Sequence, residues 1–479
     1  MQRRAGARRV PRNTILTVLA ASAFACRAPD PSARSAVPES TAEAEVLRLL
    51  EEDAPYQLVP ADLFERLGWE LPDDGQTVHA LANAAPGGAF DPRALETLPA
   101  STLGYSARWH EVRFRKYGLD WDLPALHLVP ETPVPDLPTV VFINGGSANW
   151  YEFFVGPTNA PAVAQHLAQR VPVLLLTIPG NYRHGGWDEP DFAKRTPAYV
   201  LDRDMSPEEA RVRNAIFTFA LIRDGVRASI EEVVQGPVAI VGHSTGAEVQ
   251  FLLRDALADR LHGRSLGWGT GGPASLSAMR DIRGEVSIDD YAHVSELRAR
   301  GPEEYARRYV GPLNPLWRDD ATPLEVATQW IRLEARRRPQ FKQPLQDMEH
   351  QGADALRPQV EAQIREVLRG NTLGVDADEV VADLFTTTAA PVVGYRRMIW
   401  TTALGDTNHW HADPALAREV RISAEFRQAN PGVPIRVLVF GVPLSHYGHL
   451  ERPRELAGGL LAALRWVSAE EPGSAAPAG

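Results

Sequence analysis

Cysteine is almost absent from the sequence of 479 residues, which contains only one, Cys26. A lone cysteine cannot form a disulfide within the chain, so the folded state must be stabilised by its apolar core. Long apolar runs are missing as well, because no segment reaches the roughly 20 residues that a membrane-spanning helix needs. These two absences exclude a disulfide-stapled scaffold and a body embedded in the bilayer.

A positive net charge is the third feature that the sequence lacks. Lys and Arg number 50 against 61 Asp and Glu, which gives a net charge of -11. Five arginines and no acid lie in residues 1–25, so removal of that segment lowers the net charge to -16. A protein of this sign repels phosphate backbones, and we expect no nucleic-acid partner. The apolar content of 44% is ordinary for a globular protein.

Residues 1–26 have the pattern of an export signal. Arginines precede an apolar run at residues 15–25, which is too short to cross a bilayer as a stable helix, so we expect cleavage. Cys26 follows Ala23-Phe24-Ala25, which resembles the lipobox of bacterial lipoproteins, where this cysteine is acylated. The resemblance implies a lipid anchor on Cys26 and a place in the cell envelope. The alternative is plain secretion, with Cys26 as a small apolar residue of the signal.

Apolar strand runs alternate with helices over most of the remaining chain. A capping box is clear in Ser206-Pro207-Glu208-Glu209, where a serine N-cap is followed by proline and, three residues after the cap, by glutamate. This alternation predicts an α/β fold whose mostly parallel sheet is covered by helices on both faces. The expected strands are 139–143, 173–178, 238–241, 398–404 and 437–440.

The alternation is interrupted between about residues 291 and 390, where only helices are expected, among them 322–338 and 358–368. A short amphipathic helix is also expected at 40–53. The chain then divides into a signal (1–26), a tether with an N-terminal extension (27–105), a first core part (106–290), a helical insertion (291–390), a second core part (391–467) and a disordered tail (468–479).

The third strand leads into Gly242-His243-Ser244-Thr245-Gly246, and residues 247–257 then have a helical pattern. A bare G-x-S-x-G occurs by chance in roughly one chain in ten, so the strand and helix on either side carry the weight. Small residues are needed at 242 and 246 because the sharp turn leaves no room for side chains. The pattern predicts that Ser244 is a nucleophile; the alternative is a tight structural turn.

A serine hydroxyl needs a positioned base to remove its proton. The last strand is followed by His446 and then by Glu451-Arg452-Pro453, which begins an apolar helix. This resembles the ending of α/β-hydrolases, in which the catalytic histidine lies five residues before such a Glu-Arg-Pro, and the spacing selects His446. The alternative base is His449, which we otherwise expect to be a packing or surface residue.

The resemblance to the α/β-hydrolase superfamily covers about residues 106–290 and 391–467. It implies a doubly wound sheet, a cap formed by the helical insertion, an acyl-enzyme mechanism and no cofactor. The insertion could instead be a structural layer unrelated to substrate. Epoxide hydrolases and haloalkane dehalogenases of this fold carry aspartate at the elbow, so Ser244 favours acyl transfer.

Acyl transfer also requires donors for the oxyanion. The backbone N–H of Thr245 is one. Asn144-Gly145-Gly146 follows the first strand and resembles the family's His-Gly-x turn, which makes the N–H of Gly146 the second; the alternative is a plain Gly-Gly turn. The aromatic residues at 150, 151, 153 and 154 could wall an apolar pocket, but such residues more often belong to the core.

The acid of the triad is the residue at which the sequence departs from the family pattern. The family places it three residues beyond a glycine after the next-to-last strand, and from Gly405 this position is the uncharged Asn408. The nearest carboxylate is Asp406, which we assign as the acid. Asp413 is the downstream alternative, and Asp289 or Asp290 would match the displaced acid of some relatives.

Two further motifs are judged to be without function. Residues 267–272 satisfy G-x-G-x-x-G, but no strand is expected before them, so we interpret them as a loop. His409, His411 and Asp413 have the types of metal ligands, but alternate residues form a metal face only on a strand, and we expect no metal.

The function expected from these features is hydrolysis of a small-molecule carboxylic ester through an acyl-enzyme. An acyltransferase or a thioesterase on the same fold is the near alternative. A non-catalytic, ligand-binding envelope lipoprotein is the alternative from another class.

Overall fold

The computed structural model describes most of the chain between residues 40 and 469, and no residue outside that span. Contacts divide the chain into one unit of Met1–Ser35 with Glu470–Gly479 and a second unit of Ala36–Ala469, and every described residue belongs to the second. The described residues are 40–84, 90–143, 150–156, 160–179, 206–216, 218–243, 246, 249–250, 252–253, 257–261, 264–268, 320–322, 325–326, 357–384, 397–404, 418–444 and 447–469.

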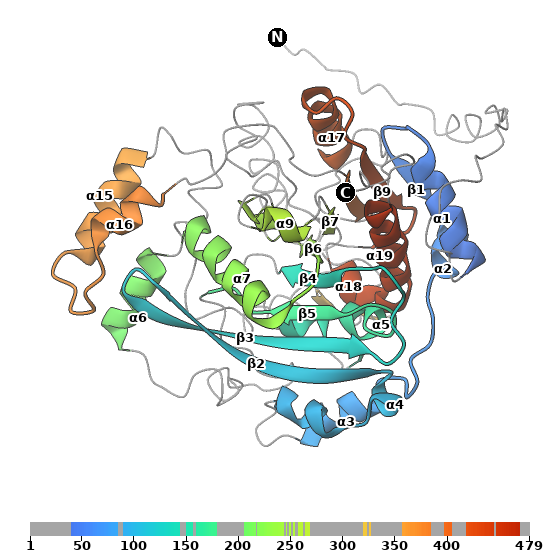
Figure 1. Ribbon diagram of the computed structural model, residues 1–479, viewed down its shortest axis with the longest axis horizontal. Helices are drawn as coiled ribbons and strands as arrows, with labels where there is room; N and C mark the ends of the chain where they lie inside the picture. The colour runs from blue at the N-terminus through green and yellow to red at the C-terminus, as the bar shows by residue number, and fades with distance from the viewer. Residues whose placement is uncertain are drawn as a thin grey trace, which may run out of the picture. The chain divides into compact units, whose positions relative to one another are not determined.

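A nine-stranded sheet runs through the described residues in the order β1-β9-β8-β7-β6-β4-β5-β3-β2 (Figure 1). Neighbouring strands from β1 to β5 in this order are parallel, whereas β3 pairs antiparallel with both β5 and β2. The strands are β1 Gln57–Val59, β2 Tyr105–Lys116, β3 Leu119–Pro130, β4 Thr139–Ile143, β5 Val173–Leu176, β6 Val238–His243, β7 Arg264–Trp268, β8 Arg397–Ala403 and β9 Ile435–Phe440.

Helices cover both faces of this sheet, which confirms the predicted doubly wound α/β architecture. They are α1 Thr41–Glu51, α2 Ala61–Glu65, α3 Gln76–Ala84, η2 Pro92–Thr97, α4 Ala100–Leu103, η3 Trp150–Phe153, α5 Val163–Leu167, α6 Pro207–Ala215, α7 Phe219–Val233, α9 Ala258–Leu261, α15 Arg357–Leu368, α16 Ala377–Ala382, α17 Arg418–Ala429, α18 Gly448–Glu451 and α19 Pro453–Ser468. None of these helices is long and apolar enough to cross a membrane.

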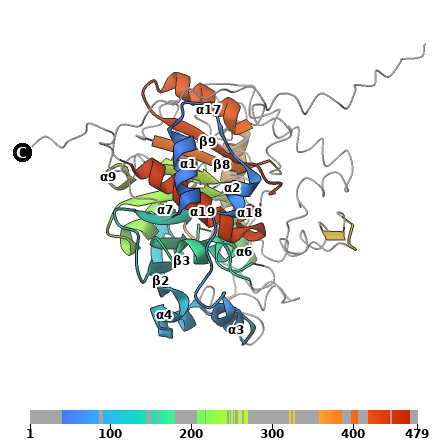
Figure 2. The same cartoon turned by 90° about the vertical axis from the view of Figure 1, so that its right-hand side faces the viewer.

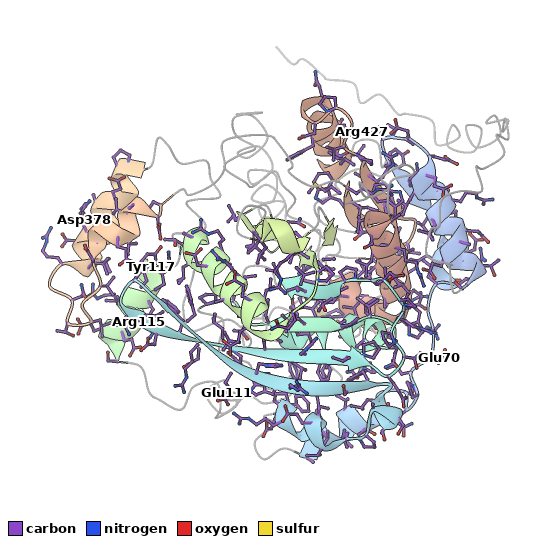
Figure 3. All side chains as sticks on the ribbon, viewed as in Figure 1. Glu70, Glu111, Arg115, Tyr117, Asp378 and Arg427 are labelled. Carbon is purple, nitrogen blue, oxygen red and sulfur yellow. The ribbon has the colours of Figure 1, made fainter. Side chains whose placement is uncertain are left out.

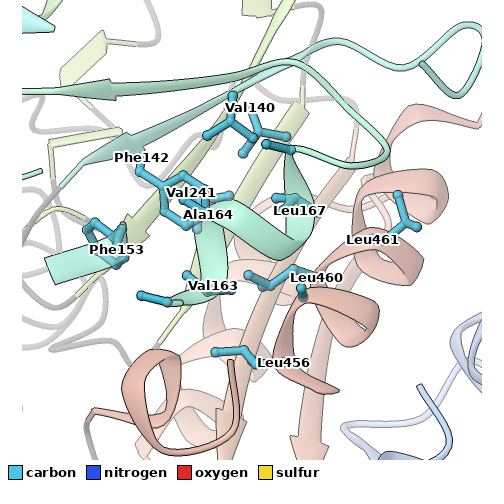
Figure 4. Close-up of a cluster of buried hydrophobic side chains, with 14 of the residues drawn as sticks. Val140, Phe142, Phe153, Val163, Ala164, Leu167, Val241, Leu456, Leu460 and Leu461 are labelled. Carbon is cyan, nitrogen blue, oxygen red and sulfur yellow. The ribbon is translucent and has the colours of Figure 1, made fainter. Parts of the chain in front are cut away.

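Successive side chains of the central strands belong to two separate apolar clusters, because alternate residues of a strand point to opposite faces of the sheet. Val241 packs with α1, α5 and α19 on one face, and Ile240 packs with α7, α9 and α17 on the other. In Figure 4 Phe142 and Val241 face Leu460 and Leu461 of α19 across α5. Strands buried on both faces have continuous apolar runs, which is why β4 and β6 could be predicted from the sequence.

Helix starts follow the capping signals. The Oγ of Ser206 accepts a hydrogen bond from the N–H of Glu209 at 3.0 Å and begins α6, as predicted. A second helix begins soon after α6 ends, where the Oγ of Thr218 accepts a hydrogen bond from the N–H of Leu221 at 3.0 Å and begins α7. Threonine is a preferred N-cap residue, because its hydroxyl can accept from the free N–H groups of the first turn.

Residues 27–105 were expected to be a tether and an N-terminal extension, but two elements in this range pack as parts of the core. Strand β1 pairs in parallel with β9, and α1 lies against α19 (Figure 2), where Glu43 forms a buried ion pair with Arg465. Helix α1 was predicted, but β1 was not, because a strand of three residues is too short to show a period.

The interpretation of residues 267–272 as a loop was wrong for the first two. Gly267 and Trp268 end β7, which lies between β6 and β8 in the sheet; residues 269–272 lie outside the described part. The segment Arg264–Trp268 has only two large apolar side chains, so it lacks the continuous apolar run that is typical of a central parallel strand.

Candidate active site

The order of the strands indicates where a ligand site can form. After β4 the chain adds β5 on one side and then β6 on the other, so the connections from β4 and β6 leave in opposite directions. In open α/β sheets such a switch point opens a crevice at the carboxyl ends of the strands. Ile143 pairs with Gly242 at this edge, and the residues that follow are the predicted oxyanion turn and the predicted nucleophile.

The other two predicted catalytic segments leave the same edge. Ala403, the last residue of β8, pairs with Phe440, the last of β9. Asp406 comes three residues after the first and His446 six residues after the second. Strand β7 alone separates β8 from β6, a distance of about 10 Å at the usual strand spacing. All four segments therefore emerge at one edge of the sheet.

The predicted site residues themselves lie outside the described residues. They are Gly146, Ser244, Thr245, Asp406 and His446, together with the alternative acids Asp289, Asp290 and Asp413 and the predicted lipidation site Cys26. The structure does describe the residues beside them, and these define the surroundings of the site.

A buried polar cluster lies directly beside the predicted nucleophile. His243, the last residue of β6, has its Nδ1 3.8 Å from the Oε1 of Glu152 on η3. The same oxygen is 3.8 Å from the Nε2 of His449 on α18. The imidazole centroids of His243 and His449 are 4.7 Å apart. The sequence analysis did not identify Glu152, although an acid inside the run Trp-Tyr-Glu-Phe-Phe is a usable signal, because a charge among core aromatics needs a partner.

Aromatic rings enclose this cluster. The ring of Phe153 lies 4.9 Å from that of His449 and 5.8 Å from that of His243, and Tyr447 lies 6.0 Å from His449. Tyr151 and Phe154 are equally buried, and Phe154 stacks on Phe90. Of the four aromatic residues considered for a pocket wall, the three whose side chains are described belong to the core.

His449 proves to be a core residue. Its side chain is completely buried. Its helix, α18, has Tyr447 as N-cap, whose carbonyl accepts from the N–H of Leu450 at 2.8 Å. Helix α19 follows at Pro453, as predicted. This burial is that of the packing residue which we expected at position 449.

The tip of the β2–β3 hairpin carries the described end of the helical insertion. Ala125 pairs with Leu176, the end of β5, and β3 begins six residues earlier, so the hairpin extends about 20 Å beyond the carboxyl edge of that strand. Its turn is Tyr117-Gly118, both with positive φ. Figure 3 labels Tyr117 at this tip, close to the helices α15 and α16. The hydroxyl of Tyr117 donates to Asp383 at 3.0 Å, the C-cap residue of α16.

Lys116 completes this attachment, because its Nζ lies 2.8 Å from Asp224 of α7 and 2.5 Å from Asp383. Burial alone would raise the pKa of Asp224, but hydrogen bonds from Arg223 and Lys116 hold it below its ordinary value. Burial lowers the pKa of Lys116, but its two carboxylate partners raise it by more. The described end of the insertion is thus fixed to the hairpin tip, beyond the ends of the strands from which the predicted catalytic segments emerge.

Replacing Lys116 with methionine is expected to lower the free energy of unfolding at pH 7 by about 1–3 kcal/mol, because Asp224 and Asp383 lose their shared cation. The loss should shrink as the pH falls through the folded pKa of Asp224, since its ionised form contributes stability only above that value. Urea denaturation at pH 7 and pH 3.5 measures both. Arg115→Met is the control, because its ion pair with Asp120 is exposed and contributes about 0–1 kcal/mol. Equal losses in the two variants would contradict the prediction.

No three histidine, cysteine, aspartate or glutamate side chains within the described ranges lie close enough together to hold a metal ion. His409, His411 and Asp413 lie outside those ranges. In the cluster of Glu152, His243 and His449 one carboxylate oxygen lies 3.8 Å from a nitrogen of each of two buried imidazoles.

The sequence matches the model of the alpha/beta hydrolase family over residues 140–458, two thirds of its length. The chain belongs to the α/β-hydrolase family, and its parallel sheet, elbow strand and final helix are those of that fold. A comparison with curated proteins gives no match.

Solved structures with partial likeness come from several enzymes. Epoxide hydrolase I of potato (Solanum tuberosum) is 14% identical with a TM-score of 0.35, covering 74% of this chain and 98% of that one. The carboxylesterase CesB (YbfK) of Bacillus subtilis is 14% identical with a TM-score of 0.38, covering 82% and 98%. A membrane phospholipase A, described as a bacterial virulence factor, is 15% identical with a TM-score of 0.37, covering 82% and 92%. Likenesses this weak carry no argument about activity.

Proposed function

We propose that the chain is a serine hydrolase that cleaves a carboxylic ester through an acyl-enzyme on Ser244. One observation carries the proposal: the rings of His243 and His449 are 4.7 Å apart in the core. Ser244 follows His243 directly, and His446 precedes His449 by three residues, a span of at most about 11 Å. The contact therefore supports the proposal that Ser244 and His446 lie close together at the carboxyl ends of the strands.

The proposed reaction follows from these roles. His446 takes the proton of the Ser244 hydroxyl as the serine oxygen bonds to the acyl carbon. The N–H groups of Gly146 and Thr245 stabilise the oxyanion. The protonated His446 then gives its proton to the departing alcohol as the ester C–O bond breaks. In the second half of the reaction, His446 takes a proton from water as the water oxygen bonds to the acyl carbon. His446 then returns this proton to the Ser244 oxygen as the acyl-enzyme bond breaks and the acid leaves. Asp406 orients His446 in both halves.

The acceptor of the acyl group distinguishes this function from its nearest alternatives. The test is a panel of p-nitrophenyl esters of increasing chain length, with matched thioesters and with added alcohols. It measures which leaving group is preferred and how the acyl group is divided between water and the alcohol. We expect turnover of the oxygen esters and release of free acid. Transfer to the alcohol in preference to water would instead indicate an acyltransferase, and preference for the thioesters a thioesterase. No turnover and no covalent labelling would indicate the ligand-binding lipoprotein.

We propose a place in the cell envelope, with the chain anchored by a lipid on Cys26. In a bacterial host with lipoprotein machinery the wild type should incorporate a fatty-acid analogue and sediment with membranes, whereas Cys26→Ser should do neither. Metabolic labelling followed by fractionation measures both. Wild-type protein without label would refute the anchor and favour plain secretion.

A further inference from the structure

Glu152 is an unusual residue for its position. Its side chain is only 1% exposed, and its Oε1 lies at the same distance, 3.8 Å, from nitrogens of two imidazoles that are 3% and 0% exposed. A buried carboxylate is costly unless cations or hydrogen bonds balance it. At 3.8 Å the carboxylate oxygen lies within salt-bridge distance of both histidines, each of which carries a charge only when it is protonated.

The three residues of this cluster come from three separate parts of the chain, each next to a part of the proposed site. Glu152 comes six residues after Gly146, on the helix η3 that packs against β4 and α18. His243 immediately precedes Ser244. His449 follows His446 by three residues and lies on α18. One carboxylate thus joins the segments that bear the proposed oxyanion donor, nucleophile and base.

We propose that Glu152 is a positioning residue, which holds the nucleophile elbow and the histidine loop in register through His243 and His449. The inference rests on the proposed function, because it concerns the geometry of that reaction. The side chain of Glu152 is almost fully buried, and its Oε1 lies 3.8 Å from a nitrogen of each of the two imidazoles. It acts by setting the separation of two loops, and a displacement of about 1 Å at reacting atoms can cost about 100-fold in rate.

A purely stabilising role predicts a different behaviour. Apolar residues of similar volume often stabilise a core as well as a buried ion cluster does, or better. If Glu152 served stability alone, its loss would lower the fraction of folded enzyme and leave each folded molecule fully active. If it positions the loops, the turnover rate of each folded molecule falls. Substrate affinity changes little, because the three side chains of the cluster are buried in the core.

The test is Glu152→Gln, which keeps the shape of the side chain and removes its charge. We expect kcat to fall about 10- to 100-fold with KM within about threefold. The second-order rate constant for labelling by a fluorophosphonate should fall similarly, because it depends on the alignment of nucleophile and base. Unfolding of part of the sample lowers only the fraction labelled. Glu152→Asp, which restores the charge, should recover part of both rates.

The matched control is Glu43→Gln. Glu43 is also almost fully buried and pairs with Arg465, which lies about 18 Å along α19 from its start at Pro453. This variant should lose stability but keep the wild-type labelling rate constant. His449→Gln tests the cluster from the other side and serves if Glu152→Gln does not fold; it should show the same loss of kcat, and the double variant should be no slower than either single one.

The outcomes separate this proposal from the proposed function. Wild-type enzyme that labels on Ser244, with Glu152→Gln and His449→Gln labelling at the wild-type rate constant, would overturn the positioning role and leave the serine mechanism intact. Wild-type enzyme that does not label at all would overturn the proposed function itself. A loss of rate in Glu43→Gln equal to that in Glu152→Gln would also contradict the proposal, because it would reduce the effect to general stability.

Discussion

Ser244→Ala is expected to lower kcat by about 10⁶-fold, the loss typical of a serine hydrolase deprived of its nucleophile. The hydroxyl starts the covalent step and contributes little to packing at an elbow, so the free energy of unfolding should stay within about 0.5 kcal/mol of the wild type. Steady-state hydrolysis of a model ester and urea denaturation measure the two quantities.

The control for this variant is Ser229→Ala. Ser229 is buried on α7, where its hydroxyl donates to the carbonyl of Gly225 at 3.1 Å, away from the carboxyl edge. Its loss should lower stability by about 1 kcal/mol and leave kcat unchanged. Residual activity of Ser244→Ala within tenfold of the wild type would contradict the assignment of the nucleophile.

Asp406→Asn is expected to lower kcat by about 10⁴-fold with the fold preserved, because His446 loses its counter-charge and its preferred tautomer. Separate Asp413→Asn, Asp289→Asn and Asp290→Asn variants should retain near wild-type turnover. The same ester assay on all four proteins identifies the acid. Should Asp406→Asn remain active while one of the others collapses, that other residue is the acid.

The elements that could be predicted are those whose local signals agree with their surroundings. Strand β4 was predicted with its observed bounds, and α15, α19 and the start of α6 nearly so, because buried parallel strands are continuously apolar and capped helices have fixed residues at their ends. Four strands were missed, β1, β2, β3 and β7; they are kept in the sheet by pairing with their neighbours, and a single sequence does not show that partnership.

The residues around the proposed site also differ in how far the sequence predicts them. The elbow could be predicted because strand, small residues and a helical pattern occur together along the chain. The sequence marks Glu152 as a charge among core aromatic residues, but its partners could not be predicted, because they lie on β6 and α18, which are far from η3 in the sequence. His449 is the intermediate case: the spacing to Glu451-Arg452-Pro453 set it apart from His446, but only the fold shows that it pairs with Glu152 in the core.

The helical insertion is the part in which substrate preference is expected to reside. Its described end is fixed to a hairpin that extends past the carboxyl edge, through Lys116, Tyr117 and Asp383. An attachment on this side supports a role as a cap over the proposed site, since ligands of open α/β sheets bind outside the carboxyl ends of the strands. A layer of purely structural helices would have no requirement to lie at that edge.

The central claim is that Ser244 forms a covalent intermediate, and labelling with a fluorophosphonate tests it most directly. The full chain is incubated with the probe, its mass is measured intact, and the modified peptide is sequenced. The account predicts one equivalent of probe on Ser244, with none on the Ser244→Ala variant. Folded wild-type protein that remains unmodified, or that carries the probe on another residue, would contradict it.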